Sequence, residues 1–189
     1  MEPGTIKKEM IMVAGAGMIT DEMIKRLISA FSDPSLNTRH NAIKKLAAAG
    51  ESAVLPLIHT LQEAQDADQR WYASVTLARI GEPAVGRLLE AMKGYHNSEF
   101  RKYAAAALGE IGSPAVEPLI EAMATDDREF RGFLSLALCR IGTPAVEPLT
   151  RHLENENEII KSCAALTLWQ MGEKGIGAIV EKVQREKIN

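Results

Sequence analysis

Residues 100–123 read FRKYAAAALGEIGSPAVEPLIEAM, and near-copies of this stretch recur along the chain. Gly112 stands at its centre, and the equivalent glycines along the chain are spaced 30 or 31 residues apart. They are Gly50, Gly81, Gly112, Gly142 and Gly172. Self-similarity at a fixed period of this length is the sequence signature of a repeat architecture. The sequence therefore predicts an array of similar units.

The segment after each glycine predicts an amphipathic helix. In the quoted stretch, the apolar residues of 116–123 fall at i, i+3, i+4 and i+7, which forms one buried stripe on a helix. Ser113 and Thr143 are residue types that cap helix N-termini, and Pro114 and Pro144 suit the first helical position. We expect a first helix in each unit to begin at these residues.

The segment before each glycine predicts a second, alanine-rich helix. One leucine holds the same place in every unit: Leu46, Leu77, Leu108, Leu138 and Leu168. Small residues allow close helix approach, and the glycine suits a left-handed cap at the helix C-terminus. One helix pair cannot bury both of its faces, so the units are expected to stack into an all-α solenoid.

The predicted organisation is a short N-terminal segment followed by the array. The segment is 1–19, the five helix pairs are 20–50, 51–81, 82–112, 113–142 and 143–172, and a capping helix spans 173–184. Gly15 and Gly17 resemble the start of a dinucleotide-binding loop, but Thr20 replaces the third glycine of G-x-G-x-x-G and no second strand follows. We expect the segment to cover the exposed end of the first unit.

Composition limits the classes of partner. The 189 residues are 46% hydrophobic and 25% charged, with a formal net charge of −3. This balance provides no general attraction to nucleic acid or to an anionic membrane. Two cysteines are too few for a disulfide framework, and no apolar run is long enough to span a bilayer. We expect a cytoplasmic protein with neither a nucleic-acid nor a membrane partner.

The motif F-R-x-x-A-A-x-A-L-G-x-I-G at Phe100–Gly112, with the A-V-E-P-L-I after it, resembles the HEAT repeat family. It is most similar to the short repeats named after phycobilisome lyases, and the resemblance covers roughly residues 20–184. The resemblance implies an α-solenoid whose second helices line a concave groove. Such repeats mostly act as binding scaffolds, so no enzyme activity is expected.

The groove positions implied by the resemblance form an aromatic and aliphatic strip with charged neighbours. The candidate partner-binding residues are Trp71, Tyr72, Val75, Arg79, Lys102, Tyr103, Glu110, Phe133, Leu136, Arg140 and Leu166. An exposed apolar strip rimmed by charge commonly marks a protein interaction site, where Tyr and Trp serve as anchors. The alternative is that the rings of Tyr72, Tyr103 and Phe133 pack between neighbouring helices, and the sequence leaves both possibilities open.

One basic residue recurs eleven positions before each glycine. The series is Arg39, Arg70, Arg101, Arg131 and Lys161. A phosphate-binding stripe is one interpretation. We favour a structural one, in which each cation pairs with a carbonyl or an acidic residue of the preceding loop. Asp33, Asp66 and Asp126 lie near these turns.

The resulting prediction is a non-catalytic scaffold that holds a peptide or a helix of a partner protein, without a cofactor. One alternative is a bilin-lyase-like chaperone that handles a tetrapyrrole, for which Cys163 would face the groove. Another is a DNA-binding helical-repeat protein, which the cancelling groove charges disfavour. The chain has no His-Glu dipeptide, and its four histidines lie at non-equivalent positions, so no metal site is predicted. The sequence leaves the oligomeric state open.

Overall fold

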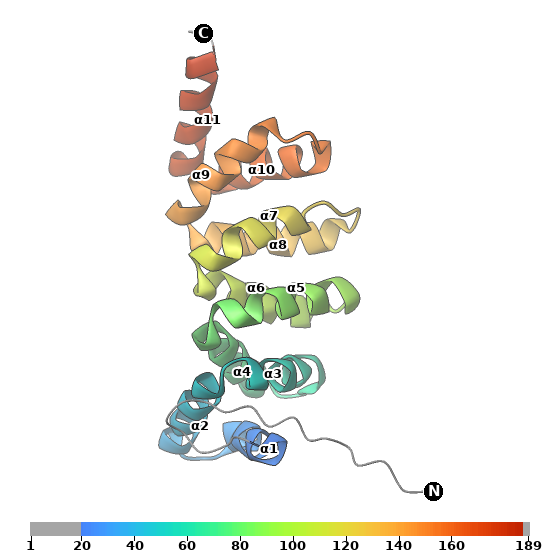
Figure 1. Ribbon diagram of the computed structural model, residues 1–189, viewed down its shortest axis with the longest axis vertical. Coiled ribbons are helices and arrows are strands. Elements are labelled where there is room, and N and C mark those ends of the chain that lie inside the picture. Colours follow the sequence, from blue (N-terminus) through green and yellow to red (C-terminus); the bar gives the residue numbers. More distant parts are fainter. Residues whose placement is uncertain (1–19, 187–189) are drawn as a thin grey trace, which may run out of the picture.

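The computed structural model describes residues 20–186, and every regular element within this range is a helix. Figure 1 shows the helices stacked in chain order, with α1 at one end and α11 at the other. The predicted all-α solenoid is confirmed. The segment predicted to cover the first unit, residues 1–19, lies outside the described residues.

Five helix pairs and one further helix make up the stack. The pairs are α1 (Asp21–Ser29) with α2 (Leu36–Ala49), α3 (Glu51–Glu63) with α4 (Ala67–Ile80), α5 (Val85–Gly94) with α6 (Ser98–Ile111), α7 (Val116–Ala122) with α8 (Arg128–Ile141), and α9 (Thr143–Arg151) with α10 (Glu158–Gln170). Helix α11 (Glu173–Glu186) follows them. Single 3₁₀ turns are η1 (Ala30–Ser32), η2 (Glu82–Ala84), η3 (Ser113–Ala115) and η4 (His152–Glu154).

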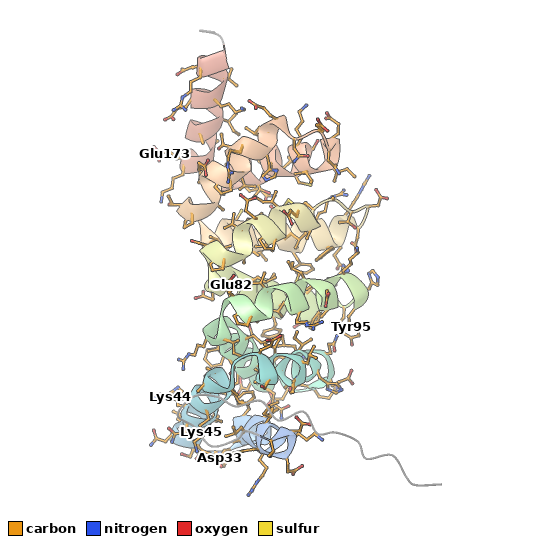
Figure 2. All side chains as sticks on the ribbon, viewed as in Figure 1. Asp33, Lys44, Lys45, Glu82, Tyr95 and Glu173 are labelled. Carbon is orange, nitrogen blue, oxygen red and sulfur yellow. The ribbon has the colours of Figure 1, made fainter. Side chains whose placement is uncertain are left out.

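The helices form two layers. Consecutive odd-numbered helices contact one another along the stack, and so do consecutive even-numbered helices. We name the first set the A layer and the second set the B layer. Figure 2 shows side chains filling the space between successive helices along the stack. The five equivalent leucines of the B layer are fully buried in this core.

The recurring glycines have positive φ angles of 60° to 81°. Such angles are strained for any residue with a Cβ, so the period in the sequence has a conformational cause. The expected left-handed helical cap is nevertheless wrong in detail. The ψ angles of Gly50, Gly81, Gly112 and Gly142 lie between −133° and −140°, which is the mirror image of the β region.

Side-chain caps occur on the B-layer helices and, at Thr20, on α1, but not at Ser113 and Thr143, where they were predicted. Gly112 and Gly142 are the N-cap residues at these two positions, and neither hydroxyl makes a capping hydrogen bond. The B-layer N-caps are Ser35, Asp66, Asn97, Asp127 and Asn157, and each accepts a backbone N–H of its first turn. Their spacing of 31, 31, 30 and 30 residues forms a second period in the chain. None of the helices in residues 20–186 has the length and apolarity needed to cross a membrane.

Candidate functional site

The predicted partner-binding residues lie on four consecutive helices of the B layer. Helix α4 carries Trp71, Tyr72, Val75 and Arg79, α6 carries Lys102, Tyr103 and Glu110, α8 carries Phe133, Leu136 and Arg140, and α10 carries Leu166. These helices contact one another in this order. We name the solvent-accessible side chains of α4, α6, α8 and α10 the B-helix face.

Tyr72 does not belong to the exposed strip that the sequence predicts, because only 6% of this residue is exposed. Its ring packs against Phe31 with the ring centroids 5.6 Å apart. Its hydroxyl accepts a hydrogen bond of 2.9 Å from Arg39 Nη1, and the Arg39 guanidinium lies 5.5 Å from its ring centroid. Tyr72 therefore joins α2 to α4 and offers no anchor to a partner. The neighbouring Trp71 is exposed and contacts the Tyr72 ring edge to face.

Tyr103 and Phe133 are half-buried and pack against the core. Within residues 20–186 their rings do not contact each other, so the expected ladder of three aromatic rings is not formed. Lys102 Nζ lies 5.9 Å from the centroid of the Tyr103 ring and 3.8 Å from the Glu99 carboxylate. The aromatic part of the B-helix face is therefore divided between separate helices.

Three of the four large exposed apolar side chains of the B-helix face lie on α8 and α10, and the fourth is Trp71 on α4. Leu166 is 60% exposed, Trp169 is 66% exposed, and Leu136 is also exposed. A cavity of about 630 Å³ opens on the same helices. Its lining residues are Glu129, Gly132, Phe133, Leu136, Cys139 and Gln170. Large apolar side chains beside an open cavity are typical of an interaction surface. We name Leu136, Leu166 and Trp169 the α8–α10 patch.

Trp169 is not among the predicted partner-binding residues, although the sequence carries a signal for it. It stands three residues before Gly172, and the equivalent residues of the other units are Ala47, Ala78, Gly109 and Cys139. These four residues are small. A tryptophan in a column of small residues is not required by the repeat, and this departure points to a local role.

The charged residues of the B-helix face are partly paired with one another. Arg140 on α8 donates hydrogen bonds from Nε and Nη2 to Glu110 Oε1 on α6, at 2.9 and 2.6 Å. Both side chains are more than half exposed, so the pair is accessible to a partner. Arg79 on α4 is also exposed. The face therefore combines apolar side chains with a fixed ion pair.

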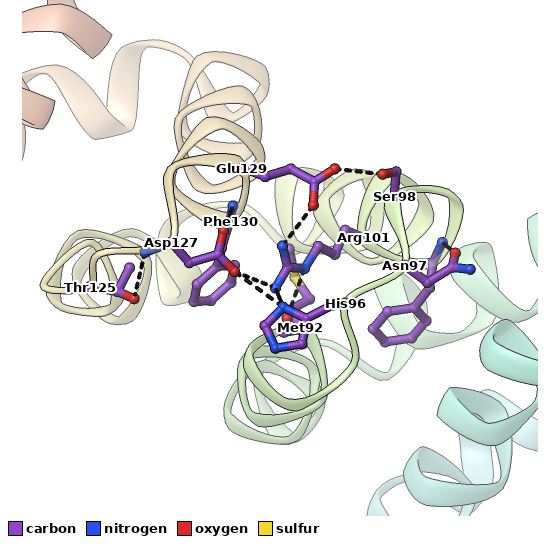
Figure 3. A network of polar contacts seen from close by, with 10 residues as sticks. Met92, His96, Asn97, Ser98, Arg101, Thr125, Asp127, Glu129 and Phe130 are labelled. Carbon is purple, nitrogen blue, oxygen red and sulfur yellow. Dashed lines mark hydrogen bonds and ion pairs between the residues drawn. The ribbon is translucent and has the colours of Figure 1, made fainter.

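The recurring basic residue forms its densest network at Arg101, whose side chain is fully buried (Figure 3). Its Nε donates to the Met92 carbonyl at 2.9 Å. Its Nη2 donates to Asp127 Oδ2 at 2.7 Å, and its Nη1 donates to Glu129 Oε2 at 3.0 Å. The hydrogen bond from Arg101 and a second one from the Phe130 backbone N–H lower the pKa of Asp127 to about 2.

Other members of this basic series also donate to loop carbonyls, as the structural interpretation expects. Arg39 donates to the carbonyl of Pro34, and Arg131 donates to that of Thr125. The expected acidic partners are wrong. Asp33 and Asp66 accept backbone N–H groups of their own loops, whereas the acids on Arg101 come from the following unit. Arg101, through Asp127 and Glu129, and Arg39, through Tyr72, therefore join neighbouring units, whereas Arg131 contacts the loop of its own unit.

The remaining chemical groups do not assemble into a reactive centre within the described residues. Burial raises the thiol pKa values of Cys139 and Cys163, which keeps both thiols protonated near neutral pH and weakly nucleophilic. No group of three or more His, Cys, Asp or Glu side chains in residues 20–186 is arranged to hold a metal ion. His152 and His96 instead lie beside the carboxylates of Glu117 and Asp127, at 3.1 and 3.4 Å.

Comparison with known proteins agrees with the repeat architecture. Residues 54–132 match the family model of HEAT repeats. No curated protein matches the sequence. The period and the two-layered stack define the class, an α-solenoid that forms a repeat scaffold. The family match specifies part of the stack further: residues 54–132 are similar to HEAT repeats.

Three solved structures that match this chain are a natural lyase complex, a designed armadillo repeat protein and an engineered protein. One is the complex of CpcE and CpcF of phycocyanin lyase from Nostoc sp. PCC7120, with 20% identity over 77% of this chain and 98% of that chain, and a TM-score of 0.40. Another is a designed armadillo repeat protein in complex with a (KR)4 peptide, with 18% identity over 86% and 90% of the two chains and a TM-score of 0.31. An engineered protein matches at 21% identity over 86% of each chain, with a TM-score of 0.34.

Proposed function

We propose that this protein is a non-catalytic scaffold that holds a peptide or a helix of a partner protein on the B-helix face. The α8–α10 patch is the observation that carries the proposal. Its three large side chains are exposed, and one of them, Leu136, lines a cavity of about 630 Å³. Burying such side chains against a partner releases about 1.5–3 kcal/mol each.

The patch is not needed to form the solenoid. At the position of Leu136 and Leu166, the three earlier units carry Lys44, Val75 and Ala106, none of which is a leucine. At the position of Trp169, every other unit has a smaller side chain. The B layer therefore stacks without these side chains, which supports a role in binding.

The geometry favours a partner segment that lies across α8 and α10. An apolar side chain of that segment would enter the cavity beside Phe133, and Trp169 would supply a large contact area and an indole N–H donor. The exposed Arg140–Glu110 pair on α8 and α6 would fix the orientation of the segment. Trp71 on α4 would form a separate contact for a longer partner.

Substitutions that copy the repeat itself test this proposal. Leu166→Lys introduces the residue type of Lys44, and Trp169→Ala introduces that of Ala47 and Ala78, so the double variant keeps the stack. Partners are recovered with the wild type, identified, purified, and titrated against both proteins. We expect the double variant to bind at least about tenfold more weakly, with an unchanged thermal midpoint.

The matched control is Leu36→Lys, which changes another exposed leucine on α2, outside the patch. It should bind as the wild type does. Unchanged affinity in the double variant, or equal loss in the control, would refute the proposed site. A shift in the absorbance of free bilin on mixing would instead favour a tetrapyrrole-handling protein.

A further inference from the structure

A second hollow lies in the A layer, between α1 and α3 at the start of the stack. It has a volume of about 930 Å³, and we name it the α1–α3 groove. Ile28, Leu55 and Pro56 supply apolar lining, while Asp21 lies at the position where α1 begins. The groove belongs to the opposite layer from the B-helix face and concerns a different role.

Leu55 departs from the pattern of the A layer. It is 60% exposed, and its equivalents in the later units are Gly86, Glu117, Glu147 and Gly177. An apolar side chain is therefore not required for stacking at this position. Its exposed side chain adds apolar surface to the α1–α3 groove.

No polar bridge closes the groove. Across the equivalent gap between α7 and α9, Arg151 Nη2 lies 2.6 Å from Glu117 Oε1 and connects the two helices. Among residues 20–186, no ion pair joins α1 to α3, although Lys25 and Glu51 line the same groove. The groove is left open to an apolar occupant.

We propose that the chain's own residues 10–19, MIMVAGAGMI, occupy the α1–α3 groove. These ten residues carry no charged or hydrogen-bonding side chain, so burial leaves no polar side chain without a partner. They join the described structure at Thr20, the N-cap of α1, directly beside the groove residue Asp21. The proposal gives the cap expected from the sequence a specific docking site.

The length of the run suits the groove. Ten residues reach about 30 Å when extended and about 15 Å as a helix, and the 13-residue helix α3 is about 20 Å long. The short tether also keeps the run at a high effective concentration, on the order of millimolar. Neither a second copy of the chain nor a free peptide has this advantage.

Disulfide trapping in the full-length chain tests the proposal. In a background with Cys139→Ser and Cys163→Ser, Val13→Cys is combined with Ser52→Cys, which places a thiol in the groove lining. The matched pair combines Val13→Cys with Glu90→Cys, an exposed position of the A layer on α5. We expect the groove pair to form an intramolecular disulfide at least about tenfold faster.

A further substitution links the trapping to the groove. Leu55→Glu introduces the residue type of Glu117 and Glu147, which the repeat tolerates, and should slow the trapping at least about tenfold. Leu36→Glu, outside the groove, should leave the rate unchanged. Circular dichroism verifies that each variant is folded. Equal rates for the two cysteine pairs would overturn the proposal. Disulfide-linked dimers would overturn it in favour of a second copy as the occupant.

Discussion

Asp127 has two roles that a single substitution can separate. Its Oδ1 accepts the Phe130 N–H at 2.9 Å and caps α8, whereas its Oδ2 accepts a hydrogen bond of 2.7 Å from the buried Arg101. Asparagine performs the capping role elsewhere in the B layer, at Asn97 and Asn157. Asp127→Asn should therefore keep the cap but remove the charge and the acceptor of the Arg101 hydrogen bond, because an amide NH2 group only donates.

We expect the stability difference between wild type and Asp127→Asn to depend on pH. The hydrogen bond from Arg101 lowers the pKa of Asp127 from its ordinary value of 3.8 to about 2. A carboxyl group with a lowered pKa stabilises the folded state above its unfolded-state pKa, and this contribution is lost as pH falls toward the folded-state value. The wild type should be more stable from about pH 5 upward, and the gap should shrink between about pH 4 and about pH 2.

Urea denaturation of both proteins across this pH range measures the gap. His96 and Glu129 also belong to the network, and both are present in the two proteins. A gap that stays constant with pH, or that widens toward low pH, would contradict the proposed contribution of the Arg101–Asp127 pair.

Among the helices, α11 packs unusually closely on its neighbour. A Cβ at Gly175 would lie 1.9 Å from the carbonyl oxygen of Leu168 on α10. Earlier units carry alanine at the equivalent position: Ala53, Ala84, Ala115 and Ala145. The glycine therefore permits an approach of α11 to α10 that the other A-layer helices do not need.

Gly175→Ala should displace α11 and destabilise it by about 1–3 kcal/mol, because the obstructing atom belongs to the backbone and cannot rotate away. Hydrogen exchange should accelerate in α11 while α2 to α6 remain protected. Gly177→Ala is the control, since no atom lies within 4 Å of its Cβ position. It should stabilise the helix by about 0.5–1 kcal/mol through helix propensity. Equal exchange rates in the two variants would refute the close-packing argument.

The elements were predictable where their cause is local. The positive φ angles at the recurring glycines and the apolar stripes at helical period are both encoded in short segments, so the sequence predicts the helices and their stacking. The prediction that Ser113 and Thr143 cap helices is wrong, because Gly112 and Gly142 are the N-cap residues and no side-chain hydrogen bond is made there. Residue type alone does not distinguish these two solutions.

The candidate site was less predictable, because exposure depends on contacts between units. Tyr72 and Tyr103 hold equivalent positions, yet only Tyr72 is buried, since Phe31 and Arg39 of the previous unit surround its ring. The acidic partners of Arg101 likewise lie 26 and 28 residues away in the chain. Such pairings follow from the stacking geometry, which the pattern of one unit does not specify.

At the scale of the whole molecule, the two candidate surfaces are separated. The α1–α3 groove lies at the start of the stack, and the α8–α10 patch lies near its other end (Figure 1). In a solenoid each unit contacts only its neighbours, so stability is approximately a sum of unit and interface terms. A partner bound at the patch should therefore leave the groove unaffected.

The same principle predicts how the stack responds to core truncation. Leu108 on α6 and Leu168 on α10 are equivalent and fully buried, but Leu108 lies in the middle of the array. Each Leu→Ala change should cost about 2–5 kcal/mol locally. Leu108→Ala weakens a unit that has neighbours on both sides, so we expect hydrogen exchange to accelerate in α4, α6 and α8 and the overall urea midpoint to fall. Leu168→Ala should accelerate exchange in α9, α10 and α11 and leave α2 to α6 protected. Acceleration in every helix for both variants would instead mean that the array unfolds as one cooperative unit.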